Sequence, residues 1–479
     1  MSSSSLRTTA ATQKILDLED AAPRELFEAL PGATVPFWAQ VRMQLGWMLS
    51  EESTGSVAVA SDNWTRRGEL TRLAKAFLPN RWDAVQRARR HDVIFYVGGG
   101  TLAPRGGRAR NWLVESFAES TDDALVIQRR PLPTAMGVPS FSPTLSMEGA
   151  TARARLWARR YVPPVETVQT VDRLLAFFAE ELGLQPAQLV PLRARVLRTE
   201  AHRPHELASL RRVVRRVRPR LVIMDTASYT YNGEAVGVFK DAGAYVVEPQ
   251  HGWIGPSHAA YNYGRAFEDA SLRRALPDEL LTFGEFWSEG LRLPAKTTAI
   301  GKPHLEEVAR SAPSVRRRQL LVISSRADPE ETDRFVTELR GALHEAWSVV
   351  FRPHPAESAA VAERYPAIAA HSGIAIDRNP DVYDSLAETR AVVGVASTVL
   401  FEAAAFGCEV IARENSFAST IVGDAFGTRV RTAVEAAGRI HALADGGVVV
   451  GEPDPALWAP DSVAGYRRWL GELLPRLGP

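Results

Sequence analysis

The stretch LVIMDTASYTYNGEAVGVFKDAGAYVVEPQ, residues 221–250, decides the fold of this chain. Its two ends, 221–229 and 244–250, are rich in β-branched and other apolar residues, a composition typical of buried strands. Residues 232–242 between them are predicted to form a helix. A strand, a helix and a strand in succession make a β-α-β unit, whose two strands run parallel.

The same alternation continues on both sides of this unit. Upstream, strands are predicted at 91–100 and 124–130, and a long helical stretch follows at about 165–217. Downstream, strands are predicted at 319–325, 347–355, 371–377, 391–397 and 408–414, with helices between them and two amphipathic helices near 432–445 and 462–476. We therefore predict an α/β protein with two facing, doubly wound Rossmann-like domains joined near 300–318, after a helical extension.

The predicted boundaries follow from these elements. Residues 1–88 are expected to hold a disordered start, at 1–12, and the helical extension. Residues 89–305 would form the N-terminal domain, for the acceptor. Residues 306–479 would form the C-terminal domain, for the donor, together with the C-terminal helices.

Composition excludes several classes of protein. A chain of 479 residues with 45% hydrophobic and 24% charged residues is globular and long enough for two or three domains. Its formal charge of +1 gives no argument for a nucleic acid partner. Cys408 is the only cysteine, which excludes an intramolecular disulfide and a thiolate zinc cluster. We find neither a secretory h-region nor an apolar run of about 20 residues, so the expected location is the cytoplasm, free or at the inner face of the membrane.

Residues 205–220 are unusually basic. Leu207, Leu210, Val213, Val214 and Val217 recur at helical spacing, and arginines occupy 211, 212, 215, 216, 218 and 220. One interpretation is a solvated helix packed on a sheet by its apolar side. The other is a helix that docks on an anionic membrane surface.

Two polar motifs end strands of the C-terminal half. The strand 391–397 runs directly into a helix through Ser397 and Thr398, which either cap that helix or form an anion site with its free N–H groups. Glu402 lies one turn further on, in an apolar segment. A buried carboxylate needs a hydrogen-bonding partner, so Glu402 is either a satisfied structural residue or an acceptor for the hydroxyls of a ribose.

The other motif is FRPHP, at the end of the strand 347–355. Its prolines stiffen the backbone that carries Arg352 and His354. Both side chains donate hydrogen bonds to phosphates. The His-Pro motif and the Ser-Thr-x-x-x-Glu motif, about 40 residues apart at successive strand ends, together favour a phosphate-binding site.

The N-terminal half places Gln250, His251 and Gly252 directly after a strand. A histidine there suits a general base that takes a proton from an acceptor hydroxyl, although a histidine that only bonds the loop backbone is the alternative. We expect Gly252 to allow the turn. His258 and Tyr261, and more weakly Gln250 and Gly252, are expected to shape the loop or contact the acceptor.

Other polar groups also lie near these strand ends. Asp225 and Glu248 either orient His251 or replace it as the base. Asp381 and Asp384 are expected to cap a helix rather than bind a metal, and the pair His251 and His258 lacks a third ligand, so no metal is expected. GGGTLAPRGGR, at 98–108, has neither P-loop nor dinucleotide-binding order and is either an acceptor-site lining or a mobile loop.

These motifs, taken in order, resemble those of bacterial glycosyltransferases of the GT-B fold. The resemblance rests on PQHGWIGPSHAAYNYG, LPDELLTFGEFWSEGL, IGKPHLE, FRPHP and VVGVASTVLFEAAAFG, and it covers roughly 220–425. It is greatest to enzymes of capsule, teichoic-acid and surface polysaccharide assembly. In those families the stretch that here begins at TFGEFW and ends at IGKPHLE crosses from the N-terminal to the C-terminal domain.

The resemblance implies roles for individual residues. Arg352, His354, Ser397 and Thr398 would bind the phosphates of the donor, Glu402 its ribose, and His251 would be the base. Two departures concern the identity of the donor. Gln250 stands where the teichoic acid polymerases have tryptophan, and Ser397-Thr398 with Glu402 replaces a Ser-Ser motif with an acidic residue.

The sequence therefore predicts a metal-independent, inverting glycosyltransferase without a cofactor. It would move a sugar from a nucleotide-sugar donor to a surface polysaccharide or lipid-linked glycan acceptor. A nucleotide-sugar 2-epimerase and a non-catalytic nucleotide-sugar-binding scaffold of a polysaccharide assembly complex are the alternatives.

Overall fold

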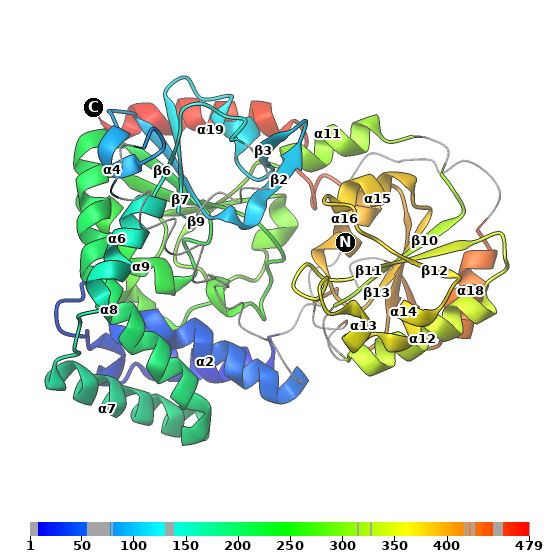
Figure 1. Cartoon of the computed structure of the whole chain (residues 1–479), viewed down its shortest axis with the longest axis horizontal. Coiled ribbons are helices and arrows are strands. Elements are labelled where there is room, and N and C mark those ends of the chain that lie inside the picture. Colours follow the sequence, from blue (N-terminus) through cyan, green and yellow to red (C-terminus); the bar gives the residue numbers. More distant parts are fainter. Residues whose placement is uncertain are drawn as a thin grey trace.

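A computed structural model describes residues 8–54, 77, 80–129, 138–313, 316–325, 328–415, 418, 421–422, 427–443 and 454–478. Within these residues the chain forms two parallel sheets, of seven and six strands, and helices cover both sheets (Figure 1). The predicted fold class, two facing Rossmann-like domains with helices at the N-terminus, is confirmed.

The first sheet has the strand order β5-β4-β1-β6-β7-β8-β9, and all of its pairings are parallel. Its order reverses between β1 and β6, which makes these two strands the topological switch point. The strands β5, β8 and β9 were not predicted, because they are three or four residues long and lack a continuous apolar run. The bounds are β1 Val93–Val97, β4 Ala124–Gln128, β5 Thr144–Ser146, β6 Leu221–Met224, β7 Tyr245–Pro249, β8 Glu279–Thr282 and β9 Lys296–Ala299.

The second sheet has the order β12-β11-β10-β13-β14-β15 and is also parallel throughout. Its switch point lies between β10 and β13. Ile323 of β10 pairs with Arg352 of β11 and with Gly394 of β13, so these three strands end at the same level. The bounds are β10 Gln319–Ile323, β11 Ser348–Arg352, β12 Ile374–Ile376, β13 Ala391–Gly394, β14 Glu409–Arg413 and β15 Thr428–Val430.

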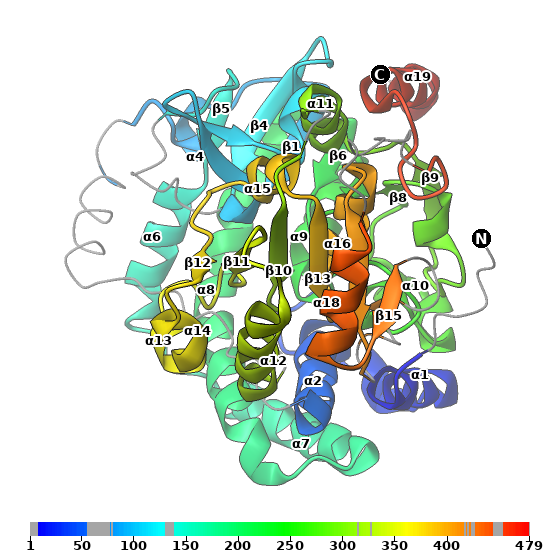
Figure 2. The same cartoon turned by 90° about the vertical axis from the view of Figure 1, so that its right-hand side faces the viewer.

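Helices cover both faces of each sheet with apolar side chains. On the first sheet, α6 (Glu148–Ala158), α8 (Pro186–Val217) and α9 (Gly233–Asp241) pack on one face. On the second sheet, one face carries α12 (Pro329–Ala342), α14 (Pro366–Ala370) and α18 (Ala433–His441), which stand in front in Figure 2. The other face carries α11 (Pro303–Ser311), α15 (Val382–Glu388) and α16 (Thr398–Ala405).

The C-terminal helix belongs to the first domain by its contacts, although the boundary 306–479 assigned it to the second. Helix α19 (Ser462–Leu473) and α5 (Glu115–Ala118) cover the face of the first sheet that α8 leaves open. The rings of Phe117 and Tyr466 stack there with centroids 4.6 Å apart. Helix α19 therefore covers apolar side chains of the first sheet that would otherwise be exposed to water.

The segment that leads to α19 lies against the crossing segment so closely that two glycines are required. A Cβ atom at Gly284 would lie 2.2 Å from the carbonyl oxygen of Ala456. A Cβ atom at Gly301, where φ is +85°, would lie 2.2 Å from the carbonyl oxygen of Ala459. The chain therefore passes twice between the domains at one place.

The glycine-rich segment at 98–108 is neither a P-loop nor a loose loop in the structure. The strands β2 (Leu102–Arg105) and β3 (Arg108–Asn111) form an antiparallel hairpin. Gly106 and Gly107 have φ angles of +57° and +74°, the positive values that a tight two-residue hairpin turn requires. Arg105 forms an ion pair with Glu307 of α11 at 2.9 Å, so the hairpin contacts the start of the second domain.

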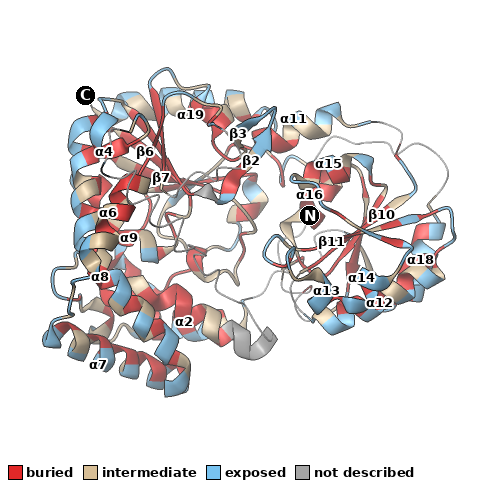
Figure 3. Ribbon diagram, in the orientation of Figure 1, coloured by how far each residue is buried: buried red, intermediate tan, exposed pale blue. Residues whose placement is uncertain are grey.

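The N-terminal helices pack below the first domain as a helical layer. Helix α1 (Ala10–Ala21) and α2 (Phe37–Thr54) share an apolar core with α7 (Val165–Leu182) and with residues 263–276, and Figure 3 shows their buried sides in red. The predicted disorder of 1–12 is wrong for its last residues, because Thr9 caps α1 by accepting from Thr12 N. Residues 1–7 lie outside the described part of the chain.

One fully buried ion pair joins this layer to the loop after β7. Arg42 Nε donates to Glu19 Oε1 at 2.7 Å, and neither side chain is exposed. Arg42 also donates to the carbonyl oxygens of Ala259 and Asn262, at 2.6 and 3.0 Å. Gly264 N donates to Glu19 Oε2 at 2.8 Å. The helical extension thus holds the segment that carries His258 and Tyr261.

Replacing Arg42 by Met should lower the free energy of unfolding by about 3–5 kcal/mol, because it leaves the Glu19 carboxylate buried and unpaired. Urea titration followed by circular dichroism measures this change. The matched control is Arg24→Met, since Arg24 is 87% exposed beside Glu25 and its loss should cost less than about 1 kcal/mol. Equal effects of the two substitutions would contradict the role of the buried pair.

Candidate functional site

Four strands of the first sheet end in polar or glycine residues at one edge. Gly98 follows β1, Arg129 follows β4, Asp225 follows β6 and His251 lies two residues beyond β7. Ligands of doubly wound sheets bind at this edge, near the topological switch point. The described structure therefore brings the predicted base to the edge at which a ligand is expected.

Asp225 lies at the switch point itself, and its carboxylate is fully engaged. Gly98 N lies 3.0 and 2.9 Å from its two oxygens, and Arg129 forms an ion pair with it. Arg129 also donates to Thr226 Oγ1 at 3.0 Å. Thr226 has φ of +57°, a strained value for a β-branched residue. With Gly98 N and Arg129 as its partners, Asp225 fixes the geometry of this edge.

His251 has one nitrogen inside the protein. Its Nδ1 is buried without a hydrogen bond in the described structure and lies 3.7 Å from Glu248 Oε1, while 23% of the side chain is exposed. Burial lowers the pKa of His251 below its usual value. The positive charges of Arg129 and Lys302 lower this pKa further, whereas the negative charge of Asp225 raises it. A neutral imidazole is the state that a general base requires.

Glu248 stands behind His251 and is completely buried. Its carboxylate accepts hydrogen bonds from Ser228 N and from the hydroxyl of Tyr261, the latter at 2.8 Å. Burial raises the pKa of Glu248 to about 7, although both hydrogen bonds act in the opposite direction. Glu248 is thus the nearest carboxylate to Nδ1 of His251 and suits an orienting role.

The other residues predicted on the acceptor side support the loop from within. Tyr261 and Gln250 are each 1% exposed, and Gln250 donates to Gly252 O at 2.9 Å and accepts from Phe283 N at 2.7 Å. We therefore assign no direct acceptor contact to these two side chains. A Cβ at Gly252 would meet no atom within 4 Å, so the turn does not require glycine there.

His258 has both ring nitrogens engaged. Nδ1 accepts from Ala260 N at 3.2 Å, and Nε2 lies 3.2 Å from the hydroxyl of Tyr229. Burial lowers the pKa of His258 to about 3. His258 therefore stays neutral and starts the turn at 259–261 as its cap. Both histidines of this loop are half-buried, and His258 is the one whose two ring nitrogens are both engaged.

In the second domain, the predicted phosphate site is a helix start. Ser397 is the N-cap of α16, and its Oγ accepts from Val399 N at 3.2 Å. Thr398 is the first residue of the helix, and both side chains are half-buried. Capping and anion binding are compatible here, because a cap uses one of the several free N–H groups of a helix start.

Arg352 and His354 lie at the end of β11, and one strand, β10, separates β11 from β13, the strand that leads to this helix start. Arg352 donates to Asp377 Oδ2 at 2.5 Å, which fixes its guanidinium. His354 Nδ1 accepts from Ala356 N at 3.1 Å, so a neutral ring carries its proton on Nε2. An Nε2–H group is the donor that a phosphate oxygen needs.

Sequence reasoning missed Glu357, which holds the His-Pro loop. Glu357 is 3% exposed and accepts from Ser324 Oγ at 2.6 Å, from the hydroxyl of Tyr365 at 2.9 Å and from Arg364 Nε at 2.9 Å. It ties the loop to the end of β10. No periodicity marks such a residue, because its partners come from different elements.

Sequence reasoning also missed Lys302, although it lies in the quoted crossing segment. Its ammonium group forms an ion pair with Glu402 of α16, and the two side chains are only 7% and 6% exposed. Aromatic rings surround Lys302 Nζ: Trp112 and Phe283 at 4.9 Å, Tyr383 at 5.3 Å and Trp458 at 6.0 Å. Glu402 is therefore a satisfied buried carboxylate, and a ribose contact would have to share it with Lys302.

A second polar contact lies beside this pair. His304 Nε2 is 2.6 Å from Asp381 Oδ2, and its ring stacks on Tyr383 with centroids 4.8 Å apart. Asp381 also caps α15 by accepting from Tyr383 N at 3.0 Å, as predicted. Within the described residues, no three His, Cys, Asp or Glu side chains are grouped so that they could hold a metal ion.

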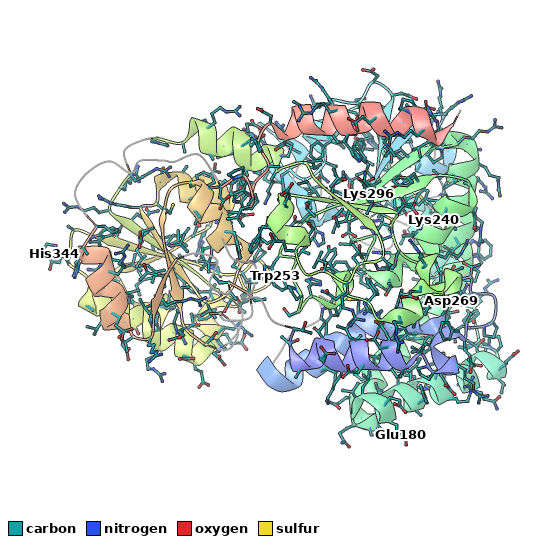
Figure 4. The ribbon with its side chains drawn as sticks, turned by 180° about the vertical axis from the view of Figure 1, so that it is seen from behind. Glu180, Lys240, Trp253, Asp269, Lys296 and His344 are labelled. Carbon is teal, nitrogen blue, oxygen red and sulfur yellow. The ribbon has the colours of Figure 1, made fainter. Side chains whose placement is uncertain are left out.

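The loop after β7 reaches the second domain directly. Trp253, labelled between the two domains in Figure 4, donates from Nε1 to Ile421 O at 3.1 Å. Trp287 of the crossing segment packs on Phe401 of α16, with ring centroids 4.9 Å apart. The loop that carries His251 thus contacts the second domain directly, and the helix that starts at Ser397 contacts the crossing segment.

Comparison with known proteins finds likeness in structure only. No protein-family model matches the sequence, and no curated protein matches it. A UDP-GlcNAc 2-epimerase from Methanocaldococcus jannaschii is 11% identical, with a TM-score of 0.44 over 79% of this chain and 99% of that one. HepE from Anabaena, solved with UDP, is 12% identical, with a TM-score of 0.42 over 80% and 99%. The glycotransferase of kitacinnamycin is 13% identical, with a TM-score of 0.40 over 82% and 100%. These values assign neither activity nor ligand to this chain.

Glu248→Gln should change how stability depends on pH. The Glu248 pKa is about 7 in the folded chain and about 4.5 when unfolded, so its proton stabilises the fold below pH 4.5 and this contribution is lost as pH rises through 7. The lost contribution is about 3 kcal/mol, at about 1.4 kcal/mol per pH unit. Urea unfolding between pH 4 and 8 should show a smaller loss for the variant. An exposed control, Glu289→Gln, should follow the native chain, and identical curves for all three proteins would disprove the shift.

Lys302→Met should raise the pKa of His251, because it removes a positive charge that disfavours the imidazolium. NMR titration of the ring protons measures this pKa. Lys302→Met combined with Glu402→Gln avoids an unpaired buried carboxylate and should preserve the fold. Lys14→Met is the control, since Lys14 contacts Leu182 O in the helical layer, and it should leave the pKa unchanged. An unchanged pKa in both Lys302 variants would contradict the electrostatic link.

Proposed function

We propose that this protein is a GT-B-type glycosyltransferase that moves a sugar from a nucleotide-sugar donor to a hydroxyl of a surface glycan or lipid-linked acceptor. The proposal rests on one observation: the edge of one sheet carries a candidate base, and the edge of the other carries candidate phosphate-binding groups. A neutral, partly exposed His251 backed by Glu248 lies on the first, and hydrogen-bond donors suited to a phosphate lie on the second. The order of motifs that resembles this class of enzyme supports the same function.

In the proposed reaction, the donor phosphates bind at the start of α16, where Ser397, Thr398 and His354 provide hydrogen bonds and Arg352 provides charge. The helix dipole and these donors stabilise the negative charge that develops on the leaving nucleotide. Glu402, shared with Lys302, is the proposed contact for the ribose. No metal ion is required for this charge stabilisation.

On the acceptor side, Nε2 of His251 takes the proton of the attacking hydroxyl. The acceptor oxygen forms the new bond to the anomeric carbon as the bond from that carbon to the phosphate oxygen breaks, which inverts the anomeric centre. Nδ1–H of His251 faces Glu248, whose carboxylate stabilises the imidazolium that forms. A base with a lowered pKa stays unprotonated over a wide range of pH.

Donor binding is the first step to test, by thermal shift with UDP, CMP, CDP, GDP and TDP, each with and without EDTA. A nucleotide at 100 times its Kd should stabilise the fold by about 2.7 kcal/mol. His354→Ala should abolish this shift, because it removes a phosphate donor. The control His344→Ala alters an exposed histidine on the far side of the second domain (Figure 4) and should keep the shift. No shift with any nucleotide would overturn the donor site.

His251→Ala should leave nucleotide binding within about twofold of the native protein and lower transfer by about 10²–10⁴-fold, the usual contribution of a general base. Transfer is followed by release of nucleotide from a nucleotide-sugar in the presence of glycan acceptors. Near-normal turnover in this variant would refute the assignment of the base. Conversion of the donor sugar to its 2-epimer without an acceptor, seen by NMR, would replace the transferase by an epimerase.

A further inference from the structure

We propose that one flank of the first domain docks on an anionic lipid bilayer through helix α8. The surface is the α8 basic face, defined by the exposed residues Arg198, His205, Arg212, Arg215, Arg216 and Arg218. It lies on the side of the molecule away from the second domain, so docking would leave the domain interface uncovered (Figure 1). The proposal does not depend on the proposed transfer reaction.

Charge is concentrated here far beyond the rest of the chain. Residues 193–220 contain ten arginines and two glutamates, a net +8, whereas the whole chain carries +1, so all other residues together carry −7. The apolar side of the same helix is buried against the first sheet by Leu207, Leu210, Val213, Val214 and Val217. The basic side is therefore held outwards by packing, as the exposed colouring of α8 in Figure 3 indicates.

The arginines of 193–220 that pair with carboxylates, Arg193, Arg203 and Arg220, lie outside the α8 basic face. In the described part of the chain, Arg198, Arg212 and Arg215 form no ion pair with a carboxylate, and 198, 205 and 212 recur every seven residues and so share one face of the helix. The two glutamates of the segment do not oppose them. Glu200 is 2% exposed and pairs with Arg203, and burial raises the pKa of Glu206.

Exposed apolar side chains beside the α8 basic face favour a bilayer over a nucleic acid. Trp157, at the end of α6, is 54% exposed, and its ring stacks on His205 with centroids 6.5 Å apart. Val162 follows in the connection to α7, and Val165 is the first residue of that helix; they are 83% and 72% exposed. A tryptophan flanked by arginines suits the headgroup region of a membrane, where the ring enters and the guanidinium groups meet phosphates. Aliphatic side chains have no such use on a nucleic acid backbone.

The test is co-sedimentation with vesicles of phosphatidylcholine, with and without phosphatidylglycerol, at low and at 0.5 M salt. The native protein should bind the anionic vesicles only and should release in high salt, since salt screens the attraction. Replacing Arg198, Arg212 and Arg215 together by Gln should weaken binding about a hundredfold, at about 1 kcal/mol per arginine. Trp157→Ala should weaken binding further without changing the salt dependence.

The matched control removes the same charge from the second domain, through Arg317→Gln, Arg334→Gln and Arg431→Gln, which are exposed arginines there. Both triple variants should keep the native melting temperature, because the residues are exposed. Equal loss of binding in the two triple variants would show a general charge effect and overturn the docking surface. Binding to neutral vesicles, or binding to duplex RNA that competes with anionic vesicles, would overturn it as well.

Discussion

The buried ion pair between Lys302 and Glu402 is the interaction on which the arrangement of the two domains depends. Two charges that leave water cost several kcal/mol each, and their attraction repays this only when geometry and surroundings are favourable. Here the faces of aromatic rings from both domains surround the ammonium group, a setting that stabilises a cation. Lys302 belongs to the crossing segment and Glu402 to α16, so the pair sets the position of that helix relative to the first domain.

A continuous apolar core surrounds this pair and limits how the domains can move. Leu280 and Trp287 from the first domain and Leu400 and Phe401 from the second belong to the same cluster of buried residues. Such a core resists separation, because each exposed apolar side chain costs free energy. Closure of the domains on a ligand, which the proposed transfer requires in order to exclude water, must therefore pivot about this core rather than break it.

The strands and site residues that the sequence predicts are those marked by a local pattern of residues. Strands with four or five consecutive buried apolar residues, such as β1, β6 and β10, were predicted, and His251, Arg352 and Ser397 were correctly placed at or shortly after the ends of strands. Strands without an apolar run were not found; β9, for example, reads KTTA and has no buried side chain. The missed site residues have distant partners: Lys302 and Glu402 are 100 positions apart, and Arg42 and Ala259 are 217 apart. Neither periodicity nor strand position reports a contact of that kind.

Closeness in the sequence does not indicate a shared role here, because the loop after β7 carries residues with different roles. His251 and His258 are seven positions apart and both half-buried, yet Nδ1 of His251 has no hydrogen bond in the described structure, whereas both ring nitrogens of His258 are engaged. What separates them is the helical layer: Arg42 binds the backbone of 259 and 262, and this pulls the second half of the loop into the core. Among the described residues, none of 250–253 forms a hydrogen bond with the layer, and this half stays at the sheet edge. One short segment can thus supply both a base at the sheet edge and a residue that stabilises the loop from within, because a buried arginine binds only one half of the segment.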